Sequence, residues 1–463
     1  MLKKAIYILV GILVLTACTE DLSDFESRAK ELKEANAKEQ KRIEEEKKRQ
    51  EEEKQKNDSL KARLDSLINA GKGSADSLDQ PFPQVKTNLP IMEIRTNGRT
   101  SIELEYIDAH MKLREMTEDG NTASAIEADL QIKGRGNTTW SFPKKPYRLK
   151  FTEKISLLGE HKDKSWVLLA NYADKSMLRN RLAFIMSDMS NLEWTPSSHF
   201  VEVILNGEYI GTYQLVEKIK VSKHRVNVGD DGFLLEIDQR APSSGDIYFT
   251  INHLEQPVKF REPDVAEGDA NYNYVKSFIA KADEMLFSGN FTDPENGWQK
   301  YIDMDSFVDW YLINELARNN DAVFFSSCYM NLQRGGKLKM GPVWDFDLAF
   351  GNINYNNSYE TYGFWIKRVA WYSRLFQDPA FTTRVKERFD YFYEHRNDIM
   401  RIISNEAYSL KIAAQNNDEK WHTLYNYTWP NYDIWGCYSN EVQNMKEWLI
   451  ERFEWLKSQI DLL

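Results

Sequence analysis

The chain contains Arg318-Asn319-Asn320-Asp321 directly after an apolar run and, further on, Val343-Trp344-Asp345-Phe346-Asp347, and these two segments are the most informative about its fold. The apolar run, residues 307–317, has the length and composition of a buried helix. Between the two stretches the sequence predicts a strand, a turn at two adjacent glycines and a second strand. A hairpin therefore joins two acidic segments, and Asp345 follows Asp321 by 24 positions.

Acidic segments arranged in this way suit phosphoryl transfer. One carboxylate has to orient or deprotonate the attacking hydroxyl, and another has to hold Mg²⁺ against the phosphates, because the developing charge needs compensation. Asp321 is the candidate for the first role and Asp345 for the second. We expect the second strand to continue here, so that Asp347 shares a face with Asp345 and also reaches the metal. A Ca²⁺ loop and a helix-capping acid are the alternatives, but the apolar neighbours favour a metal.

Basic residues form a second group of candidates. Arg135 lies between two glycines in a loop, where backbone N–H groups can approach a phosphate and the guanidinium can neutralise it. Arg148 and Lys150 share one face of the following strand, and Lys145 comes just before it. We expect at least one of these three cations to bind phosphate, as the strand lysine of protein kinases does. An ordinary turn and a solvated basic sheet edge are the alternative interpretations.

Turn signals predict two hairpins. One covers residues 91–105 around Asn97-Gly98, and the other covers residues 200–216 around Asn206-Gly207. The second hairpin runs into Glu217, whose position resembles the hinge that hydrogen-bonds adenine in protein kinases.

Helical spacing dominates the later part of the chain. Residues 175–189 and a long stretch from Asn440 are predicted helices. The apolar stripe of the last helix consists of Val442, Met445, Leu449, Phe453, Leu456 and Ile460. A β-rich part followed by a helix-rich part indicates a two-lobed α+β domain, with residues 91–219 in the first lobe and 220–463 in the second.

Four blocks of the sequence resemble the signature of the CotH (spore coat protein H) family of atypical protein kinases. In family order, and within residues 91–400, they are Gly134-Arg135-Gly136-Asn137-Thr138-Thr139-Trp140, residues 164–176, residues 205–213 and Trp344-Asp345-Phe346-Asp347. The resemblance implies a divergent protein-kinase-like fold that uses ATP and Mg²⁺ or Mn²⁺. It implies Asp321 as the catalytic aspartate, Asp345 as the metal-binding aspartate and Asn331 as a second metal ligand. The kinase triplets His-Arg-Asp and Asp-Phe-Gly are absent from this segment.

The first 18 residues have the features of a targeting signal. Lys3 and Lys4 precede an apolar run that is too short to span a bilayer. Leu15-Thr16-Ala17-Cys18 resembles a bacterial lipobox, which would make Cys18 a lipidated residue that anchors the chain to a membrane. We therefore expect a lipoprotein that faces the periplasm or the cell surface. An ordinary secretory signal is the alternative.

Residues 19–70 are rich in charge and contain neither proline nor glycine. Scattered apolar residues keep one heptad register between Leu22 and Leu64, which predicts a long helical stalk with weak coiled-coil ends. The stalk is expected to act as a spacer, with self-association as a possibility. Residues 71–90 contain glycine, serine and three prolines, which indicates a linker.

The overall composition narrows the classes of partner. In a chain of 463 residues, 42% are apolar and 13% aromatic, which is ample for a large core. The net charge of −11 argues against nucleic acid as a partner. Cys328 and Cys437 either pair or remain free thiols, and the sequence leaves both alternatives open.

The leading functional hypothesis is a Mg²⁺/ATP-dependent kinase that phosphorylates Ser or Thr of an extracytoplasmic or surface protein. A nucleotidyl transferase on the same fold is one alternative. Another is a non-catalytic surface scaffold that binds a protein or a glycan through aromatic side chains. Those aromatic side chains are Trp421, Tyr425, Trp429, Tyr432 and Trp435.

Overall fold

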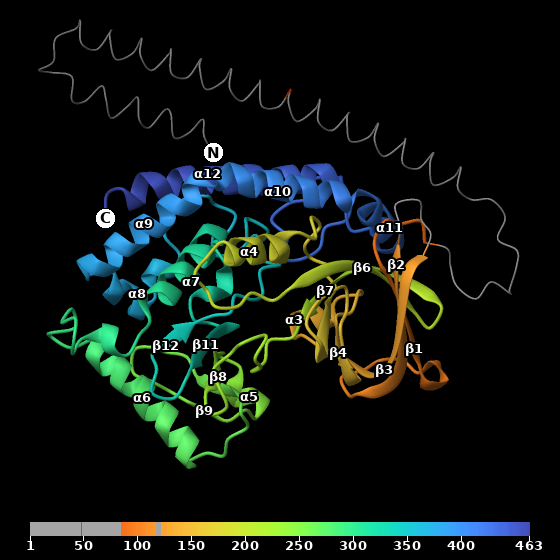
Figure 1. Ribbon diagram of the computed structural model, residues 1–463. Coiled ribbons are helices and arrows are strands. Elements are labelled where there is room, and N and C mark those ends of the chain that lie inside the picture. The colour runs from red at the N-terminus through yellow and green to blue at the C-terminus, as the bar shows by residue number, and fades with distance from the viewer. Residues whose placement is uncertain (1–47, 49–84, 117–121) are drawn as a thin grey trace, which may run out of the picture. The chain divides into compact units, whose positions relative to one another are not determined.

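The computed structural model describes residue 48, residues 85–116 and residues 122–463 (Figure 1). The expected signal segment with Cys18, the stalk at 19–70 and most of the 71–90 linker lie outside the described residues. The chain divides into two units, residues 1–78 and residues 79–463. No helix among the described residues combines the length and the apolar character needed to cross a membrane.

Strands of residues 85–116 and 122–217 close into a barrel (Figure 1). They are β1 (Ile91–Thr96), β2 (Ile107–Met116), β3 (Thr122–Gly134), β4 (Tyr147–Ile155), β5 (Asp163–Leu169), β6 (Ser198–Leu205) and β7 (Glu208–Glu217). Neighbouring strands are antiparallel except where β1 pairs with β6 in parallel, and that pairing closes the barrel. The predicted hairpin at 200–216 is confirmed, with Asn206 at φ 52° and Gly207 at φ 87° in its turn.

The hairpin predicted for residues 91–105 is wrong in its second half. After β1 the chain makes a short 3₁₀ turn, η1 (Asn97–Arg99), and β2 begins only at Ile107. Asn206 explains the early end of β1, because its side-chain oxygen accepts the backbone N–H of Thr96 at 2.9 Å. The Thr96 hydroxyl donates to the Thr100 carbonyl at 2.8 Å, so the chain turns away from the sheet.

The interior of the barrel is built by strand alternation. On β4 the side chains of Tyr147, Leu149 and Phe151 are buried, whereas Arg148 and Lys150 point outward, as predicted. These three side chains pack with apolar side chains from the other strands into a core of their own. The loops at the end of the barrel are therefore carried by a closed, rigid framework.

A second sheet follows the barrel in sequence. It contains β8 (Phe233–Ile237), β9 (Tyr248–Phe249), β10 (Val258–Glu262), β11 (Cys328–Leu332) and β12 (Leu338–Met340), in the spatial order β12-β11-β8-β10-β9. The strand pair predicted after Asp321 is thus confirmed as β11 and β12. The expected continuation of the second strand to Asp345 and Asp347 is wrong, because β12 ends at Met340 and Pro342 has no N–H to donate to a ladder.

The described helices are α4 (Arg179–Asp188), α6 (Ala270–Leu286), α7 (Met304–Ala317), α8 (Ala370–Leu375), α9 (Pro379–Glu394), α10 (Arg396–Ser409), α11 (Lys411–Trp421) and α12 (Tyr438–Ile460), with short α3 (Thr138–Ser141) and α5 (Ala241–Ser244) in connections. α7 contacts β12 of the second sheet, and α9 and α12 pack on α7. α11 packs instead on β7 of the barrel. The predicted last helix is confirmed, and its whole apolar stripe is buried. The helix predicted at 175–189 begins later, at Arg179.

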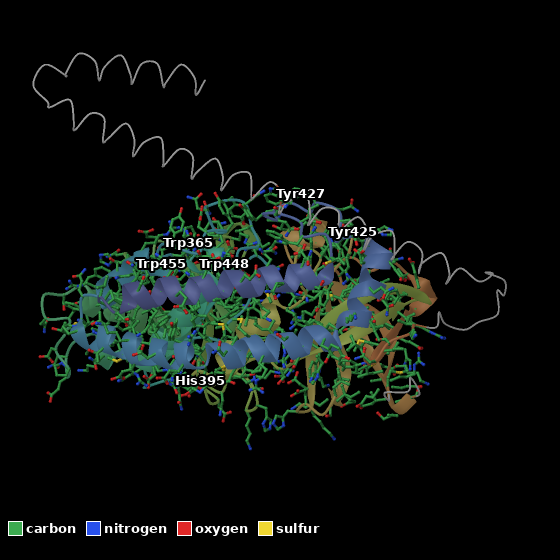
Figure 2. All side chains as sticks on the ribbon, turned by 90° about the horizontal axis from the view of Figure 1, so that it is seen from above. Trp365, His395, Tyr425, Tyr427, Trp448 and Trp455 are labelled. Atoms are coloured by element: carbon green, nitrogen blue, oxygen red, sulfur yellow. The ribbon has the colours of Figure 1, made fainter. Side chains whose placement is uncertain are left out.

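α12 lies beside α9 and α10 and covers one side of this part of the molecule (Figures 1 and 2). Its side chains join those of α7 and of the second sheet in one continuous core, separate from the core of the barrel. The mixed α+β class is therefore confirmed. The two cysteines among the described residues, Cys328 and Cys437, are free thiols.

Candidate active site

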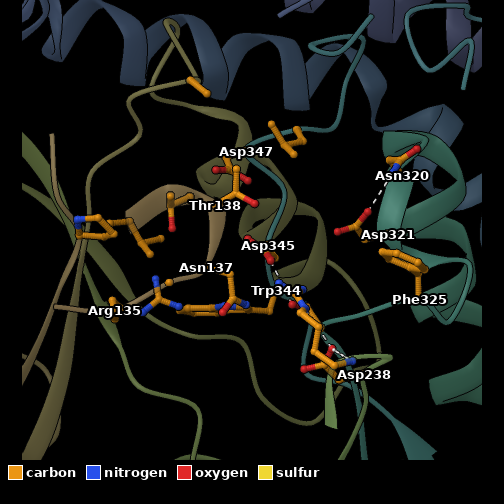
Figure 3. A pocket seen from close by; sticks show the side chains of 18 of the residues that line it. Arg135, Asn137, Thr138, Asp238, Asn320, Asp321, Phe325, Trp344, Asp345 and Asp347 are labelled. Carbon is orange, nitrogen blue, oxygen red and sulfur yellow. Dashed lines mark hydrogen bonds and ion pairs between the residues drawn. The ribbon is translucent and has the colours of Figure 1, made fainter. Parts of the chain in front are cut away.

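A cavity of about 740 Å³ is lined by the loop after β3, the end of β8, the loop after α7 and the segment after β12. Asp321, Asp345, Asp347 and Arg135 all line it, and Figure 3 shows their side chains around the same space. The size is that of an ordinary small-ligand site. The structure thus brings together acidic and basic residues that the sequence placed up to 212 positions apart.

Asp321 lies just after the C-terminal end of α7. Arg318 terminates that helix in the left-handed conformation, at φ 44°, and Asp321 follows in the short 3₁₀ turn η3 (Asn320–Ala322). Its carboxylate accepts hydrogen bonds from Asn320 Nδ2 at 2.8 Å and from Ser326 Oγ at 3.3 Å. Burial raises the pKa of Asp321, and the neighbouring charge of Asp345 raises it further. The side chain is therefore held in place and is more basic than a solvated aspartate.

Asp345 and Asp347 come from an irregular segment rather than from one face of a strand, which corrects the sequence expectation. Asp345 has φ 69°, a region in which a non-glycine residue is uncommon. Its carboxylate accepts from Ser327 Oγ at 3.0 Å. The intervening Phe346 fixes the segment, since its backbone N–H donates to Asn180 Oδ1 on α4 at 2.8 Å.

The carboxylates in the cavity repel one another. Burial, with the charges of Asp345, Asp174 and Asp321, raises the pKa of Asp347 to about 8. Among the described residues, no group of three or more His, Cys, Asp or Glu side chains is arranged to hold a metal ion. Mg²⁺ nevertheless needs only one or two carboxylates when phosphate and water supply its other ligands. Asp345 and Asp347 fit that requirement, and a cation between them would relieve the repulsion.

Arg135 lines the cavity from the loop after β3. Its guanidinium lies 5.8 Å from the centre of the Trp344 ring. Burial lowers its pKa, while the charges of Asp345, Tyr329 and Asp347 oppose that effect. A Cβ on the preceding Gly134 would lie 2.4 Å from the Trp140 ring, so the loop can pass this ring only with glycine there.

The other predicted cations do not line the cavity. Lys145 Nζ donates to the carbonyl of Trp140 at 2.6 Å. Arg148 and Lys150 lie on the outward face of β4, where both approach the ring of Tyr106, at 6.0 Å and 5.8 Å. Strand alternation predicted their common face correctly, but that face belongs to the outside of the barrel.

Neither Glu217 nor Asn331 lines this cavity, and the side chains of both form polar contacts elsewhere. Glu217 is buried and pairs with Arg225, whose Nε lies 3.2 Å from its Oε1. Asn331 donates through Nδ2 to the carbonyl of Gly341 at 3.2 Å, and it lines a separate, much smaller pocket. The structure therefore does not place either residue with the acids of the large cavity.

Lys144 is a lining residue that sequence reasoning missed. Its Nζ is buried and donates to the Thr212 carbonyl and, at 2.7 Å, to Asn417 Oδ1 on α11. Burial lowers its pKa to about 7. The sequence carries no signal that separates Lys144 from the adjacent Lys145, because both precede Pro146 in a basic run.

A charged cluster on the second sheet was missed as well. Lys259 Nζ on β10 lies 2.7 Å from Asp238, 3.2 Å from Asp246 and 3.4 Å from Glu236, all of which line the cavity with Arg261. The sequence contains a signal for this cluster: Glu236 interrupts the apolar run of β8, and a buried acid needs a charged or hydrogen-bonding partner.

Comparison with known proteins places the chain in a family. No curated protein matches it. The family model described as CotH kinase protein matches residues 132–456, which covers the loop after β3 and the acidic segments of the cavity. The chain therefore belongs to the CotH kinase family.

Proposed function

We propose that this protein is an ATP- and metal-dependent atypical protein kinase that phosphorylates Ser or Thr of an extracytoplasmic protein. One observation carries the proposal. Asp321 and the pair Asp345 and Asp347 reach one cavity from two different segments, and Arg135 reaches it from the barrel. Phosphoryl transfer requires this combination of a base, carboxylates for a metal and a cation for phosphate.

Each residue has a role that follows from its surroundings. Asp321 accepts the proton of the attacking hydroxyl, because burial raises its pKa and two hydrogen bonds fix its carboxylate. Asp345 and Asp347 hold Mg²⁺ or Mn²⁺, which, when bound, compensates the charge on the transferring phosphate. Arg135 binds a phosphate oxygen, and Asn320 orients Asp321.

The architecture supports the proposal. We infer a two-lobed kinase-like arrangement in which the barrel, within residues 91–219, acts as the first lobe and residues 220–463 form the second. The barrel has a hydrophobic core of its own, which supports its role as a lobe, whereas α4 packs into the core of the second part. The cavity is lined by residues of both parts, as a nucleotide site between lobes would be.

The place of action is inferred from the sequence. Lys3, Lys4 and the lipobox-like residues before Cys18 support a lipid anchor, and the charged residues 19–70 support a stalk between membrane and kinase domain. The protein would then meet its substrates in the periplasm or at the cell surface.

Radiolabelled ATP tests the activity. The purified full chain is incubated with Mn²⁺ or Mg²⁺ and with ATP labelled at either the γ- or the α-phosphate. We expect γ-label on the protein, with loss of labelling in Asp345→Asn and retention in Asp264→Asn, an exposed aspartate in the loop after β10. Incorporation of α-label would indicate nucleotidyl transfer instead. Absence of metal-dependent labelling from both forms of ATP would refute the proposal.

A further inference from the structure

A group of aromatic side chains, two of which line the cavity, lies on two segments that pair with each other. We define this group as the aromatic rim, and it consists of Tyr355, Tyr359, Tyr427, Trp429 and Tyr432. Tyr427 is 53% exposed, Trp429 58% and Tyr432 47%. So much exposed aromatic surface in one place marks an interaction site.

The backbone beneath the aromatic rim is fixed. Ile353 and Asn431 form an antiparallel bridge, and the N–H of Tyr432 donates to the Asn352 carbonyl at 2.8 Å. The buried Asn431 donates through Nδ2 to Asn352 Oδ1 at 3.0 Å and to the Ala173 carbonyl at 2.7 Å. The rings are therefore presented in a defined arrangement before any ligand binds.

Lys175 fixes the loop between α11 and α12, which carries Tyr425 and Tyr427 (Figure 2). Its Nζ donates to the carbonyls of Thr423 at 2.8 Å and Asn426 at 2.5 Å.

The rings are arranged in nearly parallel pairs. Tyr359 and Tyr432 stack with their centroids 4.2 Å apart and 11° between their planes. Tyr355 and Trp429 lie 6.4 Å apart at 22°. By contrast Trp421, which the sequence grouped with these aromatics, is partly buried and donates its indole N–H to the Ile210 carbonyl, so it is not part of the aromatic rim.

The polar groups between the rings are uncharged. No Asp, Glu, Lys, Arg or His occurs in residues 353–359 or 424–432. Instead the two segments carry the exposed amides Asn354, Asn356, Asn357 and Asn426. The acids Glu360 and Asp433 flank this strip, and the strip itself lacks the cations that a nucleic acid or an acidic polymer would require.

Aromatic faces and amides in this combination match an uncharged carbohydrate. The C–H faces of a sugar ring pack on aromatic rings, and amides donate to and accept from its hydroxyl groups. Tyr355, Asn356 and Trp429 also line the cavity, so a bound chain would lie next to Asp321. We propose that the aromatic rim is a binding site for an uncharged carbohydrate chain, which holds a glycan-bearing partner beside the catalytic cavity.

This binding does not depend on kinase activity, and the two can be tested apart. Native electrophoresis of the full chain is run in gels that contain a neutral glucan, mannan or xylan, in gels with acidic polygalacturonate, and in polymer-free gels. We expect at least one neutral polymer to retard the wild type. Trp429→Ala and Tyr432→Ala should each weaken the affinity by about tenfold.

Two control variants separate the role of the aromatic rim from a general effect of losing an exposed ring and from kinase activity. Tyr408→Ala removes a ring that is 81% exposed on α10, away from the aromatic rim, and should be retarded like the wild type. Asp345→Asn should also keep carbohydrate binding while it loses labelling by ATP. The proposal is overturned if no neutral polymer retards the chain, if only polygalacturonate does, or if correctly folded Trp429→Ala binds as tightly as the wild type.

Discussion

The guanidinium of Arg452 and the carboxylate of Glu315 form an ion pair of 2.6 Å that is completely shielded from solvent and joins α12 to α7. Glu315 also accepts the backbone N–H groups of residues 365–367, at 2.6 to 3.1 Å. Arg452 donates to the carbonyl of Gly363 in the same segment at 2.8 Å. The pair therefore fixes the end of α7, from which Asp321 follows.

Replacing Arg452 should destabilise the fold strongly. Arg452→Met leaves the charge of Glu315 buried without its partner, so we expect the free energy of unfolding to fall by about 3–5 kcal/mol. Urea denaturation measures the change. Arg401→Met is the matched control, because its pair with Asp398 is exposed and should contribute less than about 1 kcal/mol. Equal losses in the two variants would contradict a structural role for the buried pair.

Arg135 should control the affinity for nucleotide. Arg135→Gln removes a charge-assisted hydrogen bond to phosphate, so we expect the dissociation constant for ATP with Mg²⁺ to rise by about 10- to 100-fold. Lys150→Gln is the control, since Lys150 is exposed on the outward face of β4 and does not line the cavity. Isothermal titration calorimetry measures the dissociation constant for ATP with Mg²⁺ in both variants. If Lys150→Gln weakens binding more than Arg135→Gln, phosphate is bound elsewhere.

Lys144 should make stability depend on pH. Burial lowers its pKa to about 7 in the folded protein, whereas a lysine in an unfolded chain has a pKa of about 10.4. Between these values the unfolded state holds a proton that the folded state has released. The free energy of unfolding should therefore rise with pH in this window, by up to about 1.4 kcal/mol per pH unit, and lose this dependence below pH 7.

Lys144→Met isolates that effect from other titrating groups. Urea denaturation between pH 7 and pH 9 should give a smaller slope for the variant than for the wild type, whatever its absolute stability. Parallel curves for the two proteins would show that Lys144 keeps its charge in the folded state.

Turns and single helices were predictable from the sequence, because their formation depends on residues close together in the chain. The turn at Asn206-Gly207 and the apolar stripe of α12 are visible in a short window of sequence, and both are confirmed. Closure of the barrel was not predictable in this way. It requires Ile91 to pair with Glu202, which lies more than a hundred residues away, and no local pattern encodes that pairing.

The candidate site was predicted only in part, because local sequence signals identify some of its residues and long-range contacts position the others. Acids among apolar residues, such as Asp345 and Asp347, stand out because burial of an unpaired carboxylate is costly. Among the basic residues, Arg135 stands out through its two flanking glycines, whereas the adjacent Lys144 and Lys145 carry no signal that separates them. Lys144 lines the cavity because Asn417, 273 positions later, binds its Nζ, whereas Lys145 next to it turns to Trp140. Distant contacts decide which of the two lysines lines the cavity, and composition alone cannot show it.

Asp321→Asn tests whether Asp321 is the base for phosphoryl transfer. The side chain keeps its size but can no longer accept the proton of a hydroxyl. At saturating ATP and Mn²⁺ we predict that transfer of γ-label falls by at least about 100-fold while the dissociation constant for nucleotide changes by less than about threefold. Transfer of γ-label at the wild-type rate by Asp321→Asn would show that another group accepts the proton.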